Sequence, residues 1–157
     1  MIYGIGRTPS PEELRVQDIS VAPNGAGLPV GHGSSAEGAA LYQSMCMACH
    51  GARGEALGDF PALVGGRGSL RTAKPVLTVG SYWPYATTLW DYIRRAMPYL
   101  TPGVLSANDV YALTAFVLQM NGVIEPGIIL TEKTLPRVEM PNRDGFVADP
   151  RPDIRPR

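Results

Sequence analysis

The stretch Cys46-Met47-Ala48-Cys49-His50 contains both cysteines of the chain and one of its two histidines. The C-x-x-C-H spacing is typical of covalent attachment of a c-type haem. In such a site the two thiols bind the porphyrin, and the adjacent histidine places its imidazole against the iron. We therefore predict one haem c attached through Cys46 and Cys49, with His50 as the first axial ligand.

Three other interpretations of this motif remain. A thioredoxin-like dithiol needs its C-x-x-C within a βαβ pattern, and the sequence predicts no strand before Cys46. A structural zinc site needs four ligands, and His32 is the one further histidine. In the third interpretation the cysteines are simply buried or joined by a disulfide. A chain with two cysteines and two histidines seldom forms this pentad by accident, which favours haem attachment.

The distribution of proline divides the chain into three parts. Residues 36–122 hold five of the fifteen prolines, and the remaining ten lie in the two flanks. Proline cannot donate a hydrogen bond to a helix or a central strand. We therefore predict an extended N-terminal arm at 1–35, a packed domain that contains the haem motif at 36–122 and an extended C-terminal arm at 123–157.

Three segments of the domain have the periodicity of helices, and they are 34–49, 87–97 and 106–122. The first opens with Ser34-Ser35-Ala36-Glu37, the spacing of a capping box. The second must end at Met97, because the residue before Pro98 is disfavoured in a helix. Strand-like alternation is scarce, and Ile128-Ile129-Leu130 is too short to found a sheet. The predicted fold class is all-α.

The second axial ligand of the iron is sought among the other methionines and His32. Methionine opposite histidine is usual in electron-transfer haems and raises the reduction potential. Met97 ends a helix and enters the loop 98–105, a geometry that can fold its thioether back over the iron. We predict Met97 as this ligand, although a core methionine at a helix end fits the same pattern. The other candidates are Met1, Met45, Met47, Met120, Met140 and His32.

Charge and hydropathy exclude several functions. The fourteen basic and fourteen acidic residues cancel, which argues against nucleic acid as a partner. No run approaches the roughly 18 apolar residues that a membrane-spanning helix needs. A haem with both axial positions filled leaves no open site for substrate. We therefore predict electron transfer without catalytic residues.

The order of these features resembles a class I cytochrome c domain. It comprises C-x-x-C-H on a first helix, then Phe60-Pro61-Ala62-Leu63, then Met97-Pro98 and a last helix. The resemblance implies three or more helices around one covalent haem, with the Pro61 carbonyl accepting the Nδ1–H of His50. It also implies a crossing of the first and last helices at Gly38, Tyr42 and Phe116.

Five more segments resemble the SoxD-type cytochrome subunit, and they are 3–7, 11–14, 79–86, 89–98 and 140–146. That family partners a molybdenum-cofactor sulfite or sulfane dehydrogenase. The resemblance implies that this chain accepts electrons from such a catalytic subunit during sulfur oxidation and passes them to a downstream cytochrome. It further implies that Trp83 and Tyr82 donate hydrogen bonds to the haem propionates; an ordinary aromatic core is the alternative for both. The sequence departs from the family at 99–105 and at His32.

Two other functions stay open, a free-standing periplasmic electron carrier and a haem sensor or ligand-binding module. The haem chemistry itself implies a location, because bacteria attach haem c outside the cytoplasm. We therefore expect a periplasmic protein. The start Met1-Ile2-Tyr3-Gly4 lacks the basic and apolar regions of a signal peptide, so we expect the sequence to be that of the exported, mature protein.

Overall fold

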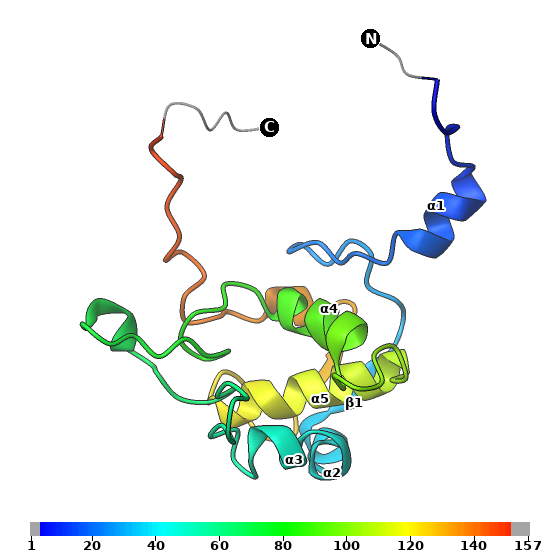
Figure 1. Cartoon of the computed structure of the whole chain (residues 1–157). Coiled ribbons are helices and arrows are strands. Elements are labelled where there is room, and N and C mark those ends of the chain that lie inside the picture. Colours follow the sequence, from blue (N-terminus) through cyan, green and yellow to red (C-terminus); the bar gives the residue numbers. More distant parts are fainter. Residues whose placement is uncertain (1–3, 152–157) are drawn as a thin grey trace.

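The computed structural model describes residues 4–151 of the chain. Figure 1 shows helix α5 running through the middle of the molecule, with α4 on one side and α2 and α3 on the other. Their bounds are α2 Ser35–Met45, α3 Met47–His50, α4 Ala86–Ala96 and α5 Ala107–Met120. The remaining elements are α1 (Pro11–Gln17), β1 (His32–Ser34), β2 (Ile129–Thr131) and two short 3-10 helices, η1 (Ser69–Arg71) and η2 (Leu135–Arg137).

Local sequence explains where the central helices begin and end. Ser34 Oγ accepts a hydrogen bond from the Glu37 backbone N–H, and the Glu37 carboxylate accepts one from the Ser34 N–H at 2.8 Å. Ser106 forms the same capping box at the start of α5. Helix α4 ends at Ala96 with Met97 as its C-cap. The predicted helical domain is present, and the predicted first helix is interrupted at Cys46, between α2 and α3.

Helices α2 and α5 cross at a point where there is no room for a side chain. A Cβ added at Gly38 would overlap the backbone of Ala112 and lie 2.8 Å from the Cβ of Phe116. Beside this contact the rings of Tyr42 and Phe116 lie 5.2 Å apart. Glycine at position 38 therefore sets the distance between the two helices, at the crossing that the resemblance implied.

We predicted that residues 128–130 are too short to form part of a sheet, and this prediction is wrong. Strand β2 pairs antiparallel with β1, with Gly33 opposite Leu130. Such short strands form because both pack on α5. Leu130 is buried, and a Cβ added at Gly33 would overlap the backbone of Ala112. Tertiary packing stabilises this sheet where the strands' own length would not.

The prediction of a wholly extended N-terminal arm is also wrong, because α1 lies within it. Ser10 caps this helix by accepting a hydrogen bond from the Glu13 N–H at 3.2 Å, and Pro11 occupies its first turn. The sequence signal was present as Ser-Pro-Glu-Glu. No residue of α1 is buried, and Figure 1 shows the helix projecting from the core.

Parts of both predicted arms pack against the domain. Leu130, Leu135 and Met140 are at most 4% exposed. On the N-terminal side, the Tyr111 hydroxyl donates to the Pro29 carbonyl at 2.9 Å. Residues 4–20 and 143–151 are exposed and form two projecting ends (Figure 1). The division of the chain at 35/36 and 122/123 remains a prediction.

Some predictions fall outside the described residues, among them Met1 as an axial ligand and the parts of the arms at 1–3 and 152–157. Within residues 4–151, no helix is both long enough and apolar enough to span a membrane.

Candidate haem site

The cysteine motif lies on one short helical turn. Helix α2 ends at Met45, and the next turn begins at Cys46, whose carbonyl accepts hydrogen bonds from the Cys49 N–H at 3.1 Å and the His50 N–H at 3.0 Å. Both cysteines are free and half-buried. The turn therefore presents two thiols and one imidazole from a single rigid segment.

His50 makes the contact that the resemblance predicted with Pro61. Its Nδ1 lies 3.3 Å from the Pro61 carbonyl oxygen. Donation from Nδ1–H to this carbonyl fixes the tautomer in which Nε2 carries a free lone pair. The ring of Phe60 lies edge-on to the imidazole at 6.2 Å. The geometry suits an axial ligand, a role that remains a prediction for His50.

Backbone contacts fold the loop after the motif against α2. The Tyr42 hydroxyl donates to the Gly51 carbonyl at 2.8 Å, and burial raises the pKa of Tyr42 to about 12, which keeps it protonated. The Leu63 N–H donates to the Gly54 carbonyl at 2.9 Å. We call α2, α3 and the loop as far as Leu63 the histidine side.

The cysteine environment argues against the alternative dithiol and zinc sites. Burial, with the neighbouring Cys49, raises the pKa of the Cys46 thiol to about 11. A reactive dithiol needs a lowered pKa, because the thiolate is the reactive form. The described residues 4–151 also contain no group of three histidine, cysteine or acidic side chains that could hold a metal ion.

Met97 lies half-buried at the end of α4 and packs against the core. Asp91 on the same helix is 7% exposed and accepts a hydrogen bond from the Val21 N–H at 3.2 Å, while pairing with Arg95. Sequence reasoning missed Asp91, because nothing near it in the sequence indicates a partner 70 residues away. We call α4, the loop 82–85 and the loop 98–105 the methionine side.

The other candidate ligands lie in different surroundings. His32 is on β1 beside Glu37 and Asn108. The eleven residues of α2 separate it from Cys46, roughly 16 Å at 1.5 Å per residue. Met140 is 4% exposed within the core, and Met120 packs there too. Met45 and Met47 lie on α2 and α3, on the histidine side.

Trp83 and Tyr82 precede α4 in an aromatic loop. Trp83 is half-buried, with its ring edge-on to Tyr92 at 5.7 Å. Tyr82 is 37% exposed and packs against Phe146 at 5.2 Å. Among residues 4–151, neither the Trp83 indole N–H nor the Tyr82 hydroxyl donates a hydrogen bond, so both can serve acidic groups of a cofactor.

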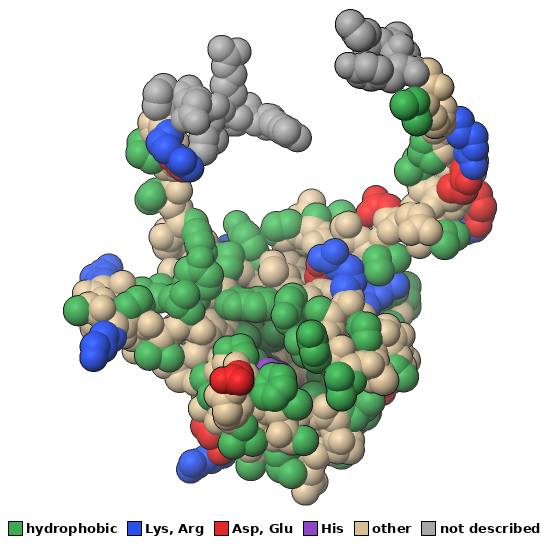
Figure 2. Space-filling view, in the orientation of Figure 1, with side chains coloured by type: hydrophobic (Ala, Val, Ile, Leu, Met, Phe, Trp, Pro, Cys, Tyr) green, Lys and Arg blue, Asp and Glu red, His purple; other side chains and the backbone are tan. Residues whose placement is uncertain are grey.

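Figure 2 shows hydrophobic side chains gathered around a hollow in which a histidine is visible. Several partly buried apolar residues pack next to the core from both sides of the site, and they include Cys46, Met47, Leu63, Trp83, Met97 and Leu105. Free thiols, an imidazole with Nε2 available and an apolar surround suit a covalently bound haem. The residues present therefore fit this cofactor.

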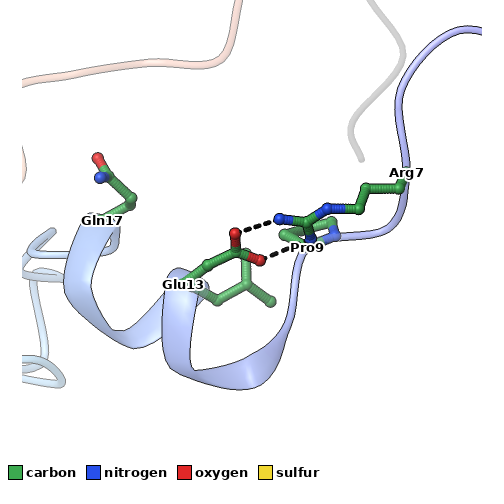
Figure 3. A pocket seen from close by; sticks show the side chains of 5 residues that line it. Arg7, Pro9, Glu13 and Gln17 are labelled. Atoms are coloured by element: carbon green, nitrogen blue, oxygen red, sulfur yellow. Dashed lines mark hydrogen bonds and ion pairs between the residues drawn. The ribbon is translucent and has the colours of Figure 1, made fainter.

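A second hollow lies on the N-terminal projecting end, away from the haem motif. Arg7, Pro9, Glu13, Leu14 and Gln17 line it (Figure 3). The Arg7 guanidinium pairs with both oxygens of Glu13, and together with Ser10 it lowers the pKa of Glu13 to about 2. These contacts fold the segment before α1 back onto the helix.

Comparisons with known proteins agree with this geometry. Residues 33–117 match the family described as cytochrome C oxidase, cbb3-type, subunit III. The crystal structure of the sulfane dehydrogenase SoxCD from Paracoccus pantotrophus matches with 44% identity and a TM-score of 0.88, over 97% of this chain and 75% of that chain.

A thiosulfate dehydrogenase (TsdBA) from Marichromatium purpuratum matches with 28% identity and a TM-score of 0.41, over 54% of this chain and 17% of that chain. That overlap is too small to bear on function. A search among curated proteins gives no significant match.

Proposed function

Since the chain belongs to the cytochrome c family that its residues 33–117 match, we propose that it accepts electrons from a molybdenum-cofactor sulfite or sulfane dehydrogenase subunit and passes them to a downstream cytochrome. The chain is an electron-transfer subunit of an oxidoreductase complex and not itself the catalytic subunit. The observation that carries the proposal is the match to SoxCD, because it extends over 97% of this chain. A haem domain alone would not require similarity in the projecting ends.

Each residue of the site would have its own role in holding the haem. A bound haem c supplies a one-electron couple. Cys46 and Cys49 would hold it covalently, and Pro61 would keep the His50 imidazole oriented with Nε2 towards the iron. Met97 would complete the ligation from the other face. If His50 and Met97 both held the iron, no position would be left for a substrate, so we assign no catalytic residue.

Haem binding would also use the aromatic loop. The free donors of Trp83 and Tyr82 suit the propionates, whose charge would otherwise be poorly solvated beside apolar residues. One C-x-x-C-H motif implies one haem c per chain. Because the chemistry of attachment belongs outside the cytoplasm, we propose a periplasmic location.

The projecting ends supply a surface for the catalytic subunit. Ile5 and Val147 are each 90% exposed, and Val16 on α1 is 62% exposed. The similarity to SoxCD covers 97% of the chain and therefore extends into these ends. We propose that both ends lie along the molybdenum subunit and hold the haem domain against it.

Mass spectrometry and mixing experiments test this function. The purified chain should carry the added mass of one haem, and it should elute together with the molybdenum subunit. Adding the sulfur substrate to that complex should then reduce the haem. A chain that stays monomeric and is not reduced would instead be a free carrier. Methionine bound to ferric haem iron gives a characteristic absorbance band, the methionine–iron band. Its absence from the ferric protein would favour the sensor alternative.

A further inference from the structure

The segment 140–146 near the C-terminus lies against the aromatic loop 82–85. The Asn142 side-chain amide donates to the Tyr82 carbonyl at 2.7 Å. The ring of Phe146 packs edge-on to the ring of Tyr82 at 5.2 Å. The Arg143 guanidinium lies over the ring of Tyr85 at 5.7 Å. Three side chains of one short segment therefore contact one loop.

The segment has a fixed shape of its own. Met140 at its start is 4% exposed and belongs to the core. The Arg143 N–H donates to the Met140 carbonyl at 3.1 Å, and the Gly145 N–H donates to the Asn142 carbonyl at 3.2 Å. A Cβ added at Gly145 would overlap the Asn142 side chain. A turn anchored in this way can hold another loop in place.

The loop that it contacts is tied to the rest of the site as well. Just before it, the Val79 N–H donates to the Leu63 carbonyl at 3.3 Å, which joins it to the end of the histidine side. Within it, Trp83 packs on Tyr92 of α4, the helix that precedes Met97. Movement of the loop 82–85 would therefore change the surroundings of the cofactor.

We propose that segment 140–146 positions the loop 82–85 over the edge of the haem and thereby raises its reduction potential, an inference that rests on the proposed function. The ferric haem carries one more positive charge than the ferrous haem, so contact with water favours the ferric state. Phe146 and Asn142 keep Tyr82 and Trp83 in place as a cover. Without that cover water reaches the haem edge, and the potential falls.

The test uses the haem-loaded full chain with Phe146→Ala and Asn142→Ala. Each variant should shift the electron-exchange equilibrium with a redox dye at least about threefold towards the ferric form. At 59 mV per tenfold change, this corresponds to a reduction potential lowered by about 28 mV. The Soret circular dichroism should change with it. Val30→Ala is the control, because this side chain is 85% exposed and lies outside both the segment and the loop. It should leave both readouts unchanged.

A third variant separates the contacts. Arg143→Gln removes the guanidinium over Tyr85 together with one positive charge and leaves the Asn142 and Phe146 contacts in place, so it should shift the equilibrium in the same direction by a smaller factor. Phe146 is 52% exposed, so its truncation leaves the core intact, and thermal unfolding checks this directly. Wild-type potential and Soret signal in both Phe146→Ala and Asn142→Ala would overturn the inference.

Failure of the proposed function would look different. In that case the wild-type chain itself would lack the methionine–iron band or would not be reduced by the molybdenum subunit. Neither observation depends on residues 140–146.

Discussion

The two sides of the candidate haem site are built in different ways. On the histidine side the hydrogen bonds of Tyr42 and His50 join residues close in sequence, Tyr42 with Gly51 and His50 with Pro61. On the methionine side they come from the ends of the chain. The Asp91 carboxylate accepts a hydrogen bond from the Val21 N–H, 70 residues away. The Tyr82 carbonyl accepts one from the Asn142 side-chain amide, 60 residues away.

This difference predicts which side a partner can influence. A protein bound to the projecting ends would act on segments that lead directly to α4 and to the loop 82–85. On the histidine side the hydrogen bonds of Tyr42 and His50 stay within residues 42–61, and Gly38 and Tyr42 pack on α5. Haem attachment should therefore be robust, while methionine ligation and potential should respond to the chain ends. Four variants test this contrast.

The largest effect is expected from Gly38→Leu, which should break the histidine side as a unit. The new side chain would overlap the backbone of Ala112 and force α2 away from α5. We expect a loss of about 3 kcal/mol or more in the free energy of unfolding. Guanidinium unfolding measures this, and Ala40→Leu on the exposed face of α2 is the control. Equal stability of the two variants would contradict the tight crossing.

Met97→Ala should affect the methionine side alone. The haem should stay attached through Cys46 and Cys49, while the methionine–iron band disappears. The reduction potential should fall by on the order of 100 mV, a fraction of the roughly 0.8 V that axial ligands span. Absorbance and redox titration measure both. Met45→Ala, at a half-exposed position on α2, should change neither. Persistence of the band in Met97→Ala would exclude Met97 as the ligand.

A smaller effect is expected from Asp91→Asn, which weakens the anchor of the N-terminal segment. Loss of the charge removes the pairing with Arg95 and weakens the bond from the Val21 N–H. We expect a destabilisation of about 1–2 kcal/mol and easier displacement of the methionine by added imidazole. Glu125→Gln, at an exposed position outside both sides of the site, is the control. A wild-type imidazole titration in Asp91→Asn would argue against coupling between this anchor and Met97.

The smallest effect concerns pH and lies on the histidine side. The Ser34 hydroxyl and N–H lower the pKa of Glu37 in the folded chain. A carboxyl with a lowered folded pKa stabilises the protein above its unfolded pKa of about 4.3, and this contribution is lost as the pH falls through the folded value. Glu37→Gln should therefore flatten the decline of the melting temperature below about pH 4.5. Unfolding scans at several pH values measure this, and an unchanged slope would show that the cap contributes little.

The same contrast explains how much could be predicted from the sequence. The haem motif, the capping boxes at Ser34 and Ser106 and the contact of His50 with Pro61 each depend on residues near one another along the chain. Each of these local geometries is present in the structure. The roles of these side chains in binding haem remain predictions.

The features that the sequence did not reveal depend on packing between distant segments. Strand β2 forms because Leu130 has α5 to pack on, and its three residues carry no such information. The anchor at Asp91 and the segment 140–146 are similar cases. Helix α1 is different, because its capping signal was present, and the density of prolines around it led to the opposite prediction.

The pairing of β1 with β2 has a consequence for affinity. It joins the bases of the two chain ends, and Figure 1 shows both ends leaving the core on the side of α4. If both ends contact one protein, the first to bind holds the second at a high effective concentration. Such bivalent binding exceeds the affinity of either contact alone by about 10²–10⁴. Removing either end would then weaken the complex by that factor and leave only the affinity of the remaining contact.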